Sequence, residues 1–263
     1  MLSVKDINLL TLNKVGKIVQ GTYVTTHLHN VTFKGYLAKP LVTDPTKLQP
    51  GVLIAHTWRG LDEFIIKKAD ALAKLGIVAY AADLFGEGKV ATTDEEAFSL
   101  IAPLFVDRLA LQERMNAAFS VLKEQPQVAK DRIGAIGFCF GGLSAIELLR
   151  SGADVKAIVS FHGVLGNELG GHKAKLAPSK QMLGSALILH GNDDPSVTDK
   201  DIAAIRAEFT KAKIDWQFHV YGNAMHAFTN PLANSPENGL LYNRSADHRS
   251  WIAMQNFFKE KLQ

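Results

Sequence analysis

Hydrophobic and polar residues follow two different patterns along the chain. Near the N-terminus, Gly21–His27 and Val31–Ala38 alternate apolar and polar residues with a period of two, which predicts an antiparallel strand pair. From Gly51 onward the pattern changes to short apolar runs that are separated by amphipathic stretches. The apolar runs predict strands buried on both faces: Gly51–His56, Ile77–Ala82, Ile133–Phe138, Val155–Phe161, Ala186–His190 and Trp216–Tyr221.

The amphipathic stretches between these runs predict helices. They are Leu61–Leu75, about Thr93–Lys123 broken or bent near Pro103, Phe140–Arg150, Thr198–Lys211 and Leu240–Leu262. Buried strands that alternate with helices are typical of a mostly parallel sheet with helices on both faces, and the N-terminal pair makes this sheet mixed. Because no linker rich in Pro, Gly or Ser and no internal repeat interrupts the order, we expect one α/β domain over residues 1–263.

Composition restricts the kinds of site that the chain can hold. Its 263 residues include one cysteine, which excludes an internal disulfide and any metal site built from several cysteines. The formal net charge is +3 and the basic residues are scattered, so we expect no nucleic-acid binding. No signal peptide is recognisable, and no apolar run approaches the ~20 residues that span a bilayer. We therefore expect a cytoplasmic protein without membrane contact, a monomer by default with a homodimer as the alternative.

The strongest local motif surrounds the single cysteine. Gly137–Gly142, with the sequence GFCFGG, joins a predicted strand to a predicted helix. A lone cysteine is more often a small buried apolar residue. A nucleophile elbow, however, requires small residues two positions before and after the nucleophile, and Gly137 and Gly141 flank Cys139 in this way. The helix N-terminus favours a thiolate, and the Phe140 N–H can serve an oxyanion hole. A dinucleotide-binding loop is the other interpretation, but G-x-G-x-x-G is absent.

A cysteine nucleophile requires a base and a carboxylate that orients the base, and two later segments supply candidates. Asp193 and Asp194 follow the strand Ala186–His190, and His226 follows the strand Trp216–Tyr221. The carboxyl ends of parallel strands meet at one edge of a sheet, so these side chains are expected near the cysteine. An isolated aspartate can equally cap a turn, and a loop histidine usually lies at the surface. The order nucleophile, acid, histidine favours a catalytic triad, with either aspartate as its acid.

Together these motifs resemble the dienelactone hydrolase family, a branch of the α/β-hydrolases with a cysteine nucleophile. The resemblance covers most of the chain from about Gly35 onward. It rests on five segments: His56–Phe64 (HTWRGLDEF), Val78–Gly88 (VAYAADLFGEG), Gly137–Gly142 (GFCFGG), Gly191–Val197 (GNDDPSV) and Tyr221–Pro231 (YGNAMHAFTNP). It implies an α/β-hydrolase fold, with a mostly parallel central sheet, helices on both faces and an antiparallel N-terminal strand pair.

The resemblance also implies roles for individual residues. It makes Cys139 the nucleophile, His226 the base and Asp194, rather than Asp193, the acid. It places the second N–H of the oxyanion hole on Trp58, where it complements Phe140. No metal ion or cofactor takes part in this chemistry.

Two departures from the family pattern concern the resting state of the cysteine and the binding of the substrate. The family's glutamate, which helps hold the resting cysteine protonated, corresponds to Thr57. The two arginines that bind the dienelactone carboxylate are replaced, one near Gly86-Glu87 and the other by Asn230. Dienelactone itself is therefore not the expected substrate.

We expect hydrolysis of a small ester, lactone or thioester through a thioacyl-enzyme. The predicted substrate contacts come from the ends of several strands: Thr57, Arg59, Phe85, His162 and Phe228. A surface salt bridge is the alternative role for Arg59, and ordinary core packing is the alternative for Phe85. A non-catalytic α/β-hydrolase-fold protein that binds a small molecule is the alternative function.

Overall fold

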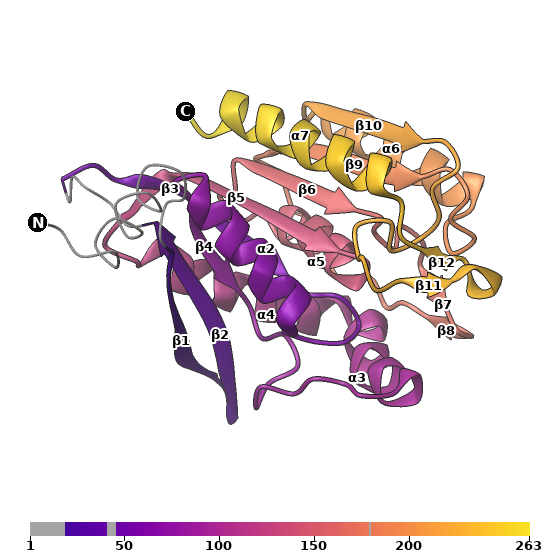
Figure 1. Ribbon diagram of the computed structural model, residues 1–263, viewed down its shortest axis with the longest axis horizontal. Coiled ribbons are helices and arrows are strands. Elements are labelled where there is room, and N and C mark those ends of the chain that lie inside the picture. The colour runs from indigo at the N-terminus through magenta and orange to yellow at the C-terminus, as the bar shows by residue number, and fades with distance from the viewer. Residues whose placement is uncertain (1–18, 41–45, 179) are drawn as a thin grey trace, which may run out of the picture.

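The computed structural model describes residues 19–40, 46–178 and 180–263. Its main sheet has eight strands, ordered β1-β2-β4-β3-β5-β6-β9-β10 (Figure 1). The strands are β1 (Val19–Leu28), β2 (Val31–Pro40), β3 (Gln49–Ala55), β4 (Val78–Ala81), β5 (Val128–Phe138), β6 (Ala157–Phe161), β9 (Ser185–Gly191) and β10 (Trp216–Tyr221). β2 pairs antiparallel with β1 and with β4, and all other neighbours pair parallel. The mixed, mostly parallel sheet predicted from the sequence is confirmed.

Helices cover both faces of this sheet, and each face has its own apolar core. The core of one face includes residues of α2 (Glu63–Lys74) and α7 (Arg244–Lys261). The other includes residues of α3 (Asp94–Val106), α4 (Arg108–Lys123), α5 (Phe140–Arg150) and α6 (Asp199–Ala212). Successive residues of β3 alternate between them: Val52 and Ile54 join the first core, and Leu53 and Ala55 join the second. Burial on both sides explains the continuous apolar run of this strand.

The long helical region after residue 93 differs from its prediction. The helix breaks at Asp107 and not at Pro103, which lies inside α3. The Asp107 N–H still donates to the Pro103 carbonyl at 2.9 Å, while its side chain accepts from the Ala110 N–H at 3.1 Å. Asp107 therefore ends α3 and caps the N-terminus of α4, a role that a short acidic side chain performs well.

The last predicted helix begins later than expected. Residues 240–241 form a short strand, β12 (Leu240–Leu241), which pairs with β11 (Asn234–Ser235) across the 3-10 turn Pro236–Asn238. α7 begins only after Asn243, whose side chain accepts from the Ala246 N–H. The loop before β9 also holds a small hairpin of β7 (Glu168–Leu169) and β8 (His172–Lys173). Figure 1 shows these short elements at the same end of the sheet as α3.

Across the described ranges, no helix combines the length and the apolar character needed to cross a membrane.

Candidate active site

Cys139 lies in the sharp turn between β5 and α5, as predicted. Its φ of 59° and ψ of −119° are unusual for a residue with a side chain. A Cβ on Gly137 would lie 1.8 Å from the carbonyl oxygen of Gly141, and a Cβ on Gly141 would lie 2.2 Å from that of Ala55. Both positions therefore require glycine, since the backbone of the turn crosses itself and β3 at these points.

Neighbouring strands hold the turn in this conformation. The Cys139 N–H donates to the Phe161 carbonyl at the end of β6, at 3.1 Å. The Cys139 carbonyl accepts from the N–H of Gly142 at 2.9 Å and from that of Val164 at 3.3 Å. The thiol is only partly buried. The strained turn thus presents a fixed sulfur atom to the space above the strand ends.

His226 and Asp194 meet at this same edge of the sheet. Nδ1 of His226 lies 2.6 Å from Oδ2 of Asp194, and both side chains are buried. The other oxygen of Asp194 accepts from the backbone N–H of Ser196 at 2.9 Å and from its hydroxyl at 2.5 Å. Asp193, in contrast, is exposed and accepts only a 2.9 Å hydrogen bond from Asn192. Asp194 is therefore the aspartate that the fold places against the histidine.

The charges in this group support one another. Burial lowers the pKa of His226, but the negative charge of Cys139 and the hydrogen bonds of His226 to Asp194 and Cys139 outweigh it and raise the pKa to about 10. Burial would raise the pKa of Asp194, yet the hydrogen bond from His226 and the two from Ser196 keep it below its ordinary value. The protonation states favoured at neutral pH are a charged imidazolium and an ionised aspartate.

A buried histidine orders the loop that follows β3. The Leu84 N–H donates to Nε2 of His56 at 3.1 Å, so the ring proton lies on Nδ1, which donates to the Thr57 carbonyl at 2.6 Å. Burial lowers the pKa of His56 to about 4, so the ring stays neutral and keeps this tautomer. The loop carries Trp58 to the cavity beside Phe140, whose N–H is in the first turn of α5 and has no intrahelical acceptor.

A second histidine packs against His226. The ring of His162 is 5.2 Å from that of His226, and its Nε2 is 2.7 Å from the Thr229 hydroxyl. Burial, followed by the nearby charge of His226, holds the pKa of His162 well below its ordinary value. A neutral His162 therefore forms part of the wall beside the imidazolium.

These groups open into a cavity of about 830 Å³. Seven of the predicted site residues line it: Thr57, Trp58, Arg59, Cys139, Phe140, His162 and His226. Two predicted substrate contacts do not. Phe85 is buried and packs on the ring of His56 at 4.5 Å, and Phe228 is fully buried against His162 at 4.9 Å. Both are core residues, because their rings pack against the buried rings of His56 and His162 and do not face the cavity.

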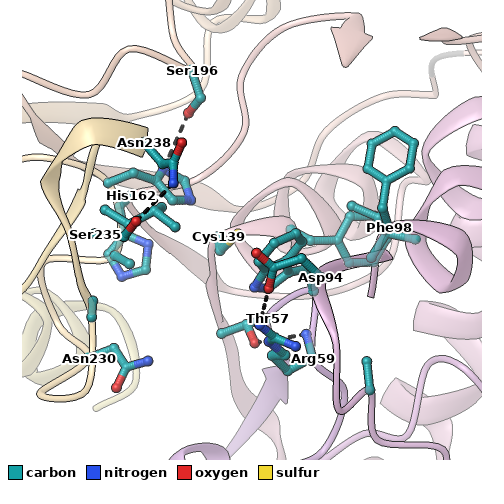
Figure 2. A pocket seen from close by; sticks show the side chains of 18 of the residues that line it. Thr57, Arg59, Asp94, Phe98, Cys139, His162, Ser196, Asn230, Ser235 and Asn238 are labelled. Atoms are coloured by element: carbon teal, nitrogen blue, oxygen red, sulfur yellow. Dashed lines mark hydrogen bonds and ion pairs between the residues drawn. The ribbon is translucent and has the colours of Figure 1, made fainter. Parts of the chain in front are cut away.

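Two segments that sequence reasoning missed complete the cavity. α3 contributes Asp94, Phe98 and Ile101, and the segment before α7 contributes polar residues. Figure 2 shows Asn230, Ser235, Asn238 and Ser196 on one side of Cys139, with Thr57, Arg59, Asp94 and Phe98 on the other. Two of these residues carried a signal in the sequence: Asn230 stands at the position of a substrate arginine of the family, and a serine two residues after an aspartate, as Ser196 is, is typical of a side-chain turn. Within the described residues, no group of three or more His, Cys, Asp or Glu side chains is arranged to hold a metal ion.

Comparison with known families agrees with this geometry. The model of the dienelactone hydrolase family matches residues 33–262. The chain belongs to the dienelactone hydrolase family. It is thus a hydrolase with the α/β-hydrolase fold, as the sequence predicted.

Among solved structures, this dienelactone hydrolase family member is similar to a dienelactone hydrolase-like promiscuous phosphotriesterase from metagenomic libraries. The two are 36% identical with a TM-score of 0.85, over 93% of this chain and 99% of that one. A putative carboxymethylenebutenolidase of Aquifex aeolicus is 26% identical over 92% of this chain and 99% of its own length. A probable 2-oxo-3-(5-oxofuran-2-ylidene)propanoate lactonase of Bradyrhizobium is 28% identical over 73% of this chain and 77% of its own length.

Proposed function

We propose that the protein hydrolyses small esters, lactones or thioesters through a triad of Cys139, His226 and Asp194 and a thioacyl-enzyme intermediate. One observation supports this most. A thiol on a strained strand–helix turn shares a cavity with a histidine whose Nδ1 is bound to a buried aspartate. This is the arrangement of nucleophile, base and orienting acid that acyl transfer requires. The lactonase and carboxymethylenebutenolidase names of its relatives support the same substrate class.

In the first half of the reaction, the Cys139 thiolate attacks the carbonyl carbon of the substrate. The carbonyl π electrons move to the oxygen, and the N–H groups of Trp58 and Phe140 donate to the resulting oxyanion, each donor contributing about 3 kcal/mol in comparable sites. When the oxyanion collapses, the bond to the leaving group breaks and the protonated His226 gives it a proton. An alcohol or a thiol departs, or the lactone ring opens, and the acyl group stays on the sulfur.

In the second half, water replaces the leaving group. Neutral His226 takes a proton from the water as its oxygen attacks the thioacyl carbon. The second tetrahedral intermediate collapses, the carbon–sulfur bond breaks and a carboxylic acid is released. The Cys139 thiolate and the His226 imidazolium are restored, and Asp194 holds the Nδ1–H of the ring in place throughout.

Two neighbouring aspartates provide a matched test of the triad. Hydrolysis of p-nitrophenyl acetate should fall at least about 10³-fold in Cys139→Ala and about 10²- to 10⁴-fold in Asp194→Asn. Asp193→Asn makes the same chemical change one residue away, at an exposed side chain, and should stay within about twofold of the wild type. Equal turnover by wild type and Cys139→Ala would refute the proposal and favour a non-catalytic binding protein.

The intermediate can be observed directly because the chain has one cysteine. Acid-quenched enzyme that has reacted with p-nitrophenyl acetate should carry one acetyl group on Cys139 by mass spectrometry, and Cys139→Ala should carry none. An acetyl group found only on another residue would contradict a thioacyl-enzyme.

A further inference from the structure

The charged residues at the cavity lie together on one wall. Apart from Cys139 and His226, the charged side chains that line the cavity within the described part of the chain are Arg59, Asp62 and Asp94. The remaining lining is apolar or carries uncharged hydroxyl and amide groups, among them Asn230 and Asn238. The ability of the site to bind a charged substrate therefore depends on whether the guanidinium of Arg59 is available.

Arg59 is already engaged by acidic groups. Its Nη2 donates to Oδ1 of Asp94, the contact drawn as a dashed line in Figure 2, and its guanidinium lies 5.0 Å over the ring of Trp58. Asp62, the other carboxylate of this wall, caps the N-terminus of α2 and accepts from the Ile65 N–H at 3.1 Å. In the described lining, one cation thus faces two carboxylates, Asp62 and Asp94, and the net charge of this wall is negative.

This balance works against a substrate that carries a carboxylate. An anion in the cavity would lose water without gaining a free cation, and it would meet the repulsion of Asp62 and Asp94. A neutral ester or lactone has no such cost. Its oxygen atoms can accept from the amides of Asn230 and Asn238, and its carbon chain can contact Phe98 across the cavity from them.

We propose that Asp94 is a specificity-determining residue: by occupying Arg59, it makes the cavity select uncharged esters and lactones over those that carry a carboxylate. The inference rests on the proposed function for its choice of substrates. What it states physically is the electrostatic field at the sulfur of Cys139. That field can be measured without any turnover.

The measurement uses two alkylating reagents of nearly equal size. Iodoacetamide is neutral and iodoacetate is an anion, and in this chain both can label only one thiol. The ratio of the iodoacetate rate to the iodoacetamide rate, normalised to N-acetylcysteine, reports the field at the sulfur. Asp94→Asn removes one negative charge and frees Arg59, so the ratio should rise about fivefold. Glu260→Gln makes the same change in charge at the far end of α7 and should leave the ratio unchanged.

A second substitution separates the release of Arg59 from a general change in charge. In an Arg59→Gln background there is no cation to release, so adding Asp94→Asn should raise the ratio much less than about fivefold, whereas a general change in charge would raise it equally in both backgrounds. Asp94 is 67% exposed and its ion pair contributes little to stability, so the single variant is expected to fold. An unchanged ratio in Asp94→Asn, or an equal rise in Glu260→Gln, would overturn the inference.

Substrates then distinguish the two proposals. The wild type should have a higher kcat/KM for p-nitrophenyl butyrate than for mono-p-nitrophenyl succinate. In Asp94→Asn, the ratio of these two kcat/KM values should be about fivefold smaller than in the wild type. If neither ester is hydrolysed, the proposed hydrolase function fails, while the alkylation ratio still decides the role of Asp94. If the wild type hydrolyses both and prefers the succinate, the selection for uncharged substrates is wrong and the hydrolase function stands.

Discussion

The turn around Cys139 permits a quantitative prediction for Gly137→Ala. A Cβ at this position would lie 1.8 Å from the Gly141 carbonyl oxygen and 2.1 Å from its carbonyl carbon. Real Cβ atoms essentially never approach other heavy atoms within 3.0 Å, so the end of β5 and the first turn of α5 must separate by about 1.2 Å. Both contacts are with backbone, so no side-chain rotation can relieve them.

This separation should affect stability and the site together. Overpacking of this kind costs about 1–3 kcal/mol or more of unfolding free energy, and a shift of about 1 Å in a catalytic group costs about 10²-fold in rate. Urea unfolding followed by tryptophan fluorescence measures the first effect. The rate of iodoacetamide labelling of Cys139, compared with the wild type, measures the second, because the sulfur would move away from His226.

Gly222→Ala is the matched control. No heavy atom lies within 4 Å of a Cβ at Gly222, and its φ is outside the left-handed region. It should change stability by less than about 1 kcal/mol, on the stabilising side, because alanine restricts the unfolded chain. If Gly137→Ala unfolds at the same urea concentration as the wild type and labels at the same rate, the steric account of the elbow is wrong.

Four further predictions test the electrostatics and hydrogen bonds of the fold. Cys139→Ala removes the largest influence that raises the pKa of His226, so an NMR titration should show that pKa falling from about 10. The pKa of His226 in the folded state lies above the ordinary value of 6.5, so protonated His226 stabilises the fold fully below pH 6.5. This contribution is lost as the pH rises through about 10. The unfolding free energies of wild type and His226→Gln should therefore converge between pH 6.5 and about 10. Ser196→Ala removes a 2.5 Å hydrogen bond to Asp194 and should cost about 1 kcal/mol in unfolding free energy. Glu147→Gln leaves the fully buried Arg108 uncompensated and should cost about 3–5 kcal/mol by denaturation, whereas Arg108→Met should be far less costly.

Sequence predicted best those elements whose side chains are buried in a regular pattern along the whole element. α5 begins and ends at the predicted residues, because the glycine turn starts it and the apolar strands around it bury its side chains throughout. The strands β3, β4, β5, β6 and β9 were recognisable because both of their faces are covered, which leaves a continuous apolar run. The elbow was equally visible, since Gly137 is required by a contact with Gly141 four residues further along, although Gly141 itself is required by a contact with Ala55 in β3.

The predictions failed where a contact from elsewhere in the chain decides the outcome. Phe85 and Phe228 end or follow strands as a pocket residue would, yet contacts with His56 and His162 hold them in the core. The choice of Asp194 over Asp193 did not fail, but it came from the family resemblance; the residues alone left both open, because the deciding contact is with a histidine 32 residues further along.

Sequence alone determined the fold class, the glycine-flanked turn and the order of Cys139, the aspartates and His226 along the chain, because these depend on local periodicity and on spacing along one chain. Only the tertiary structure decided what surrounds the thiol. α3 and the segment before α7 reach the cavity through loops whose direction no periodicity encodes, and the pairing of Arg59 with Asp94 joins residues 35 positions apart. The charge available to a substrate depends on such pairings in space, which the count of acidic and basic residues along the chain does not contain.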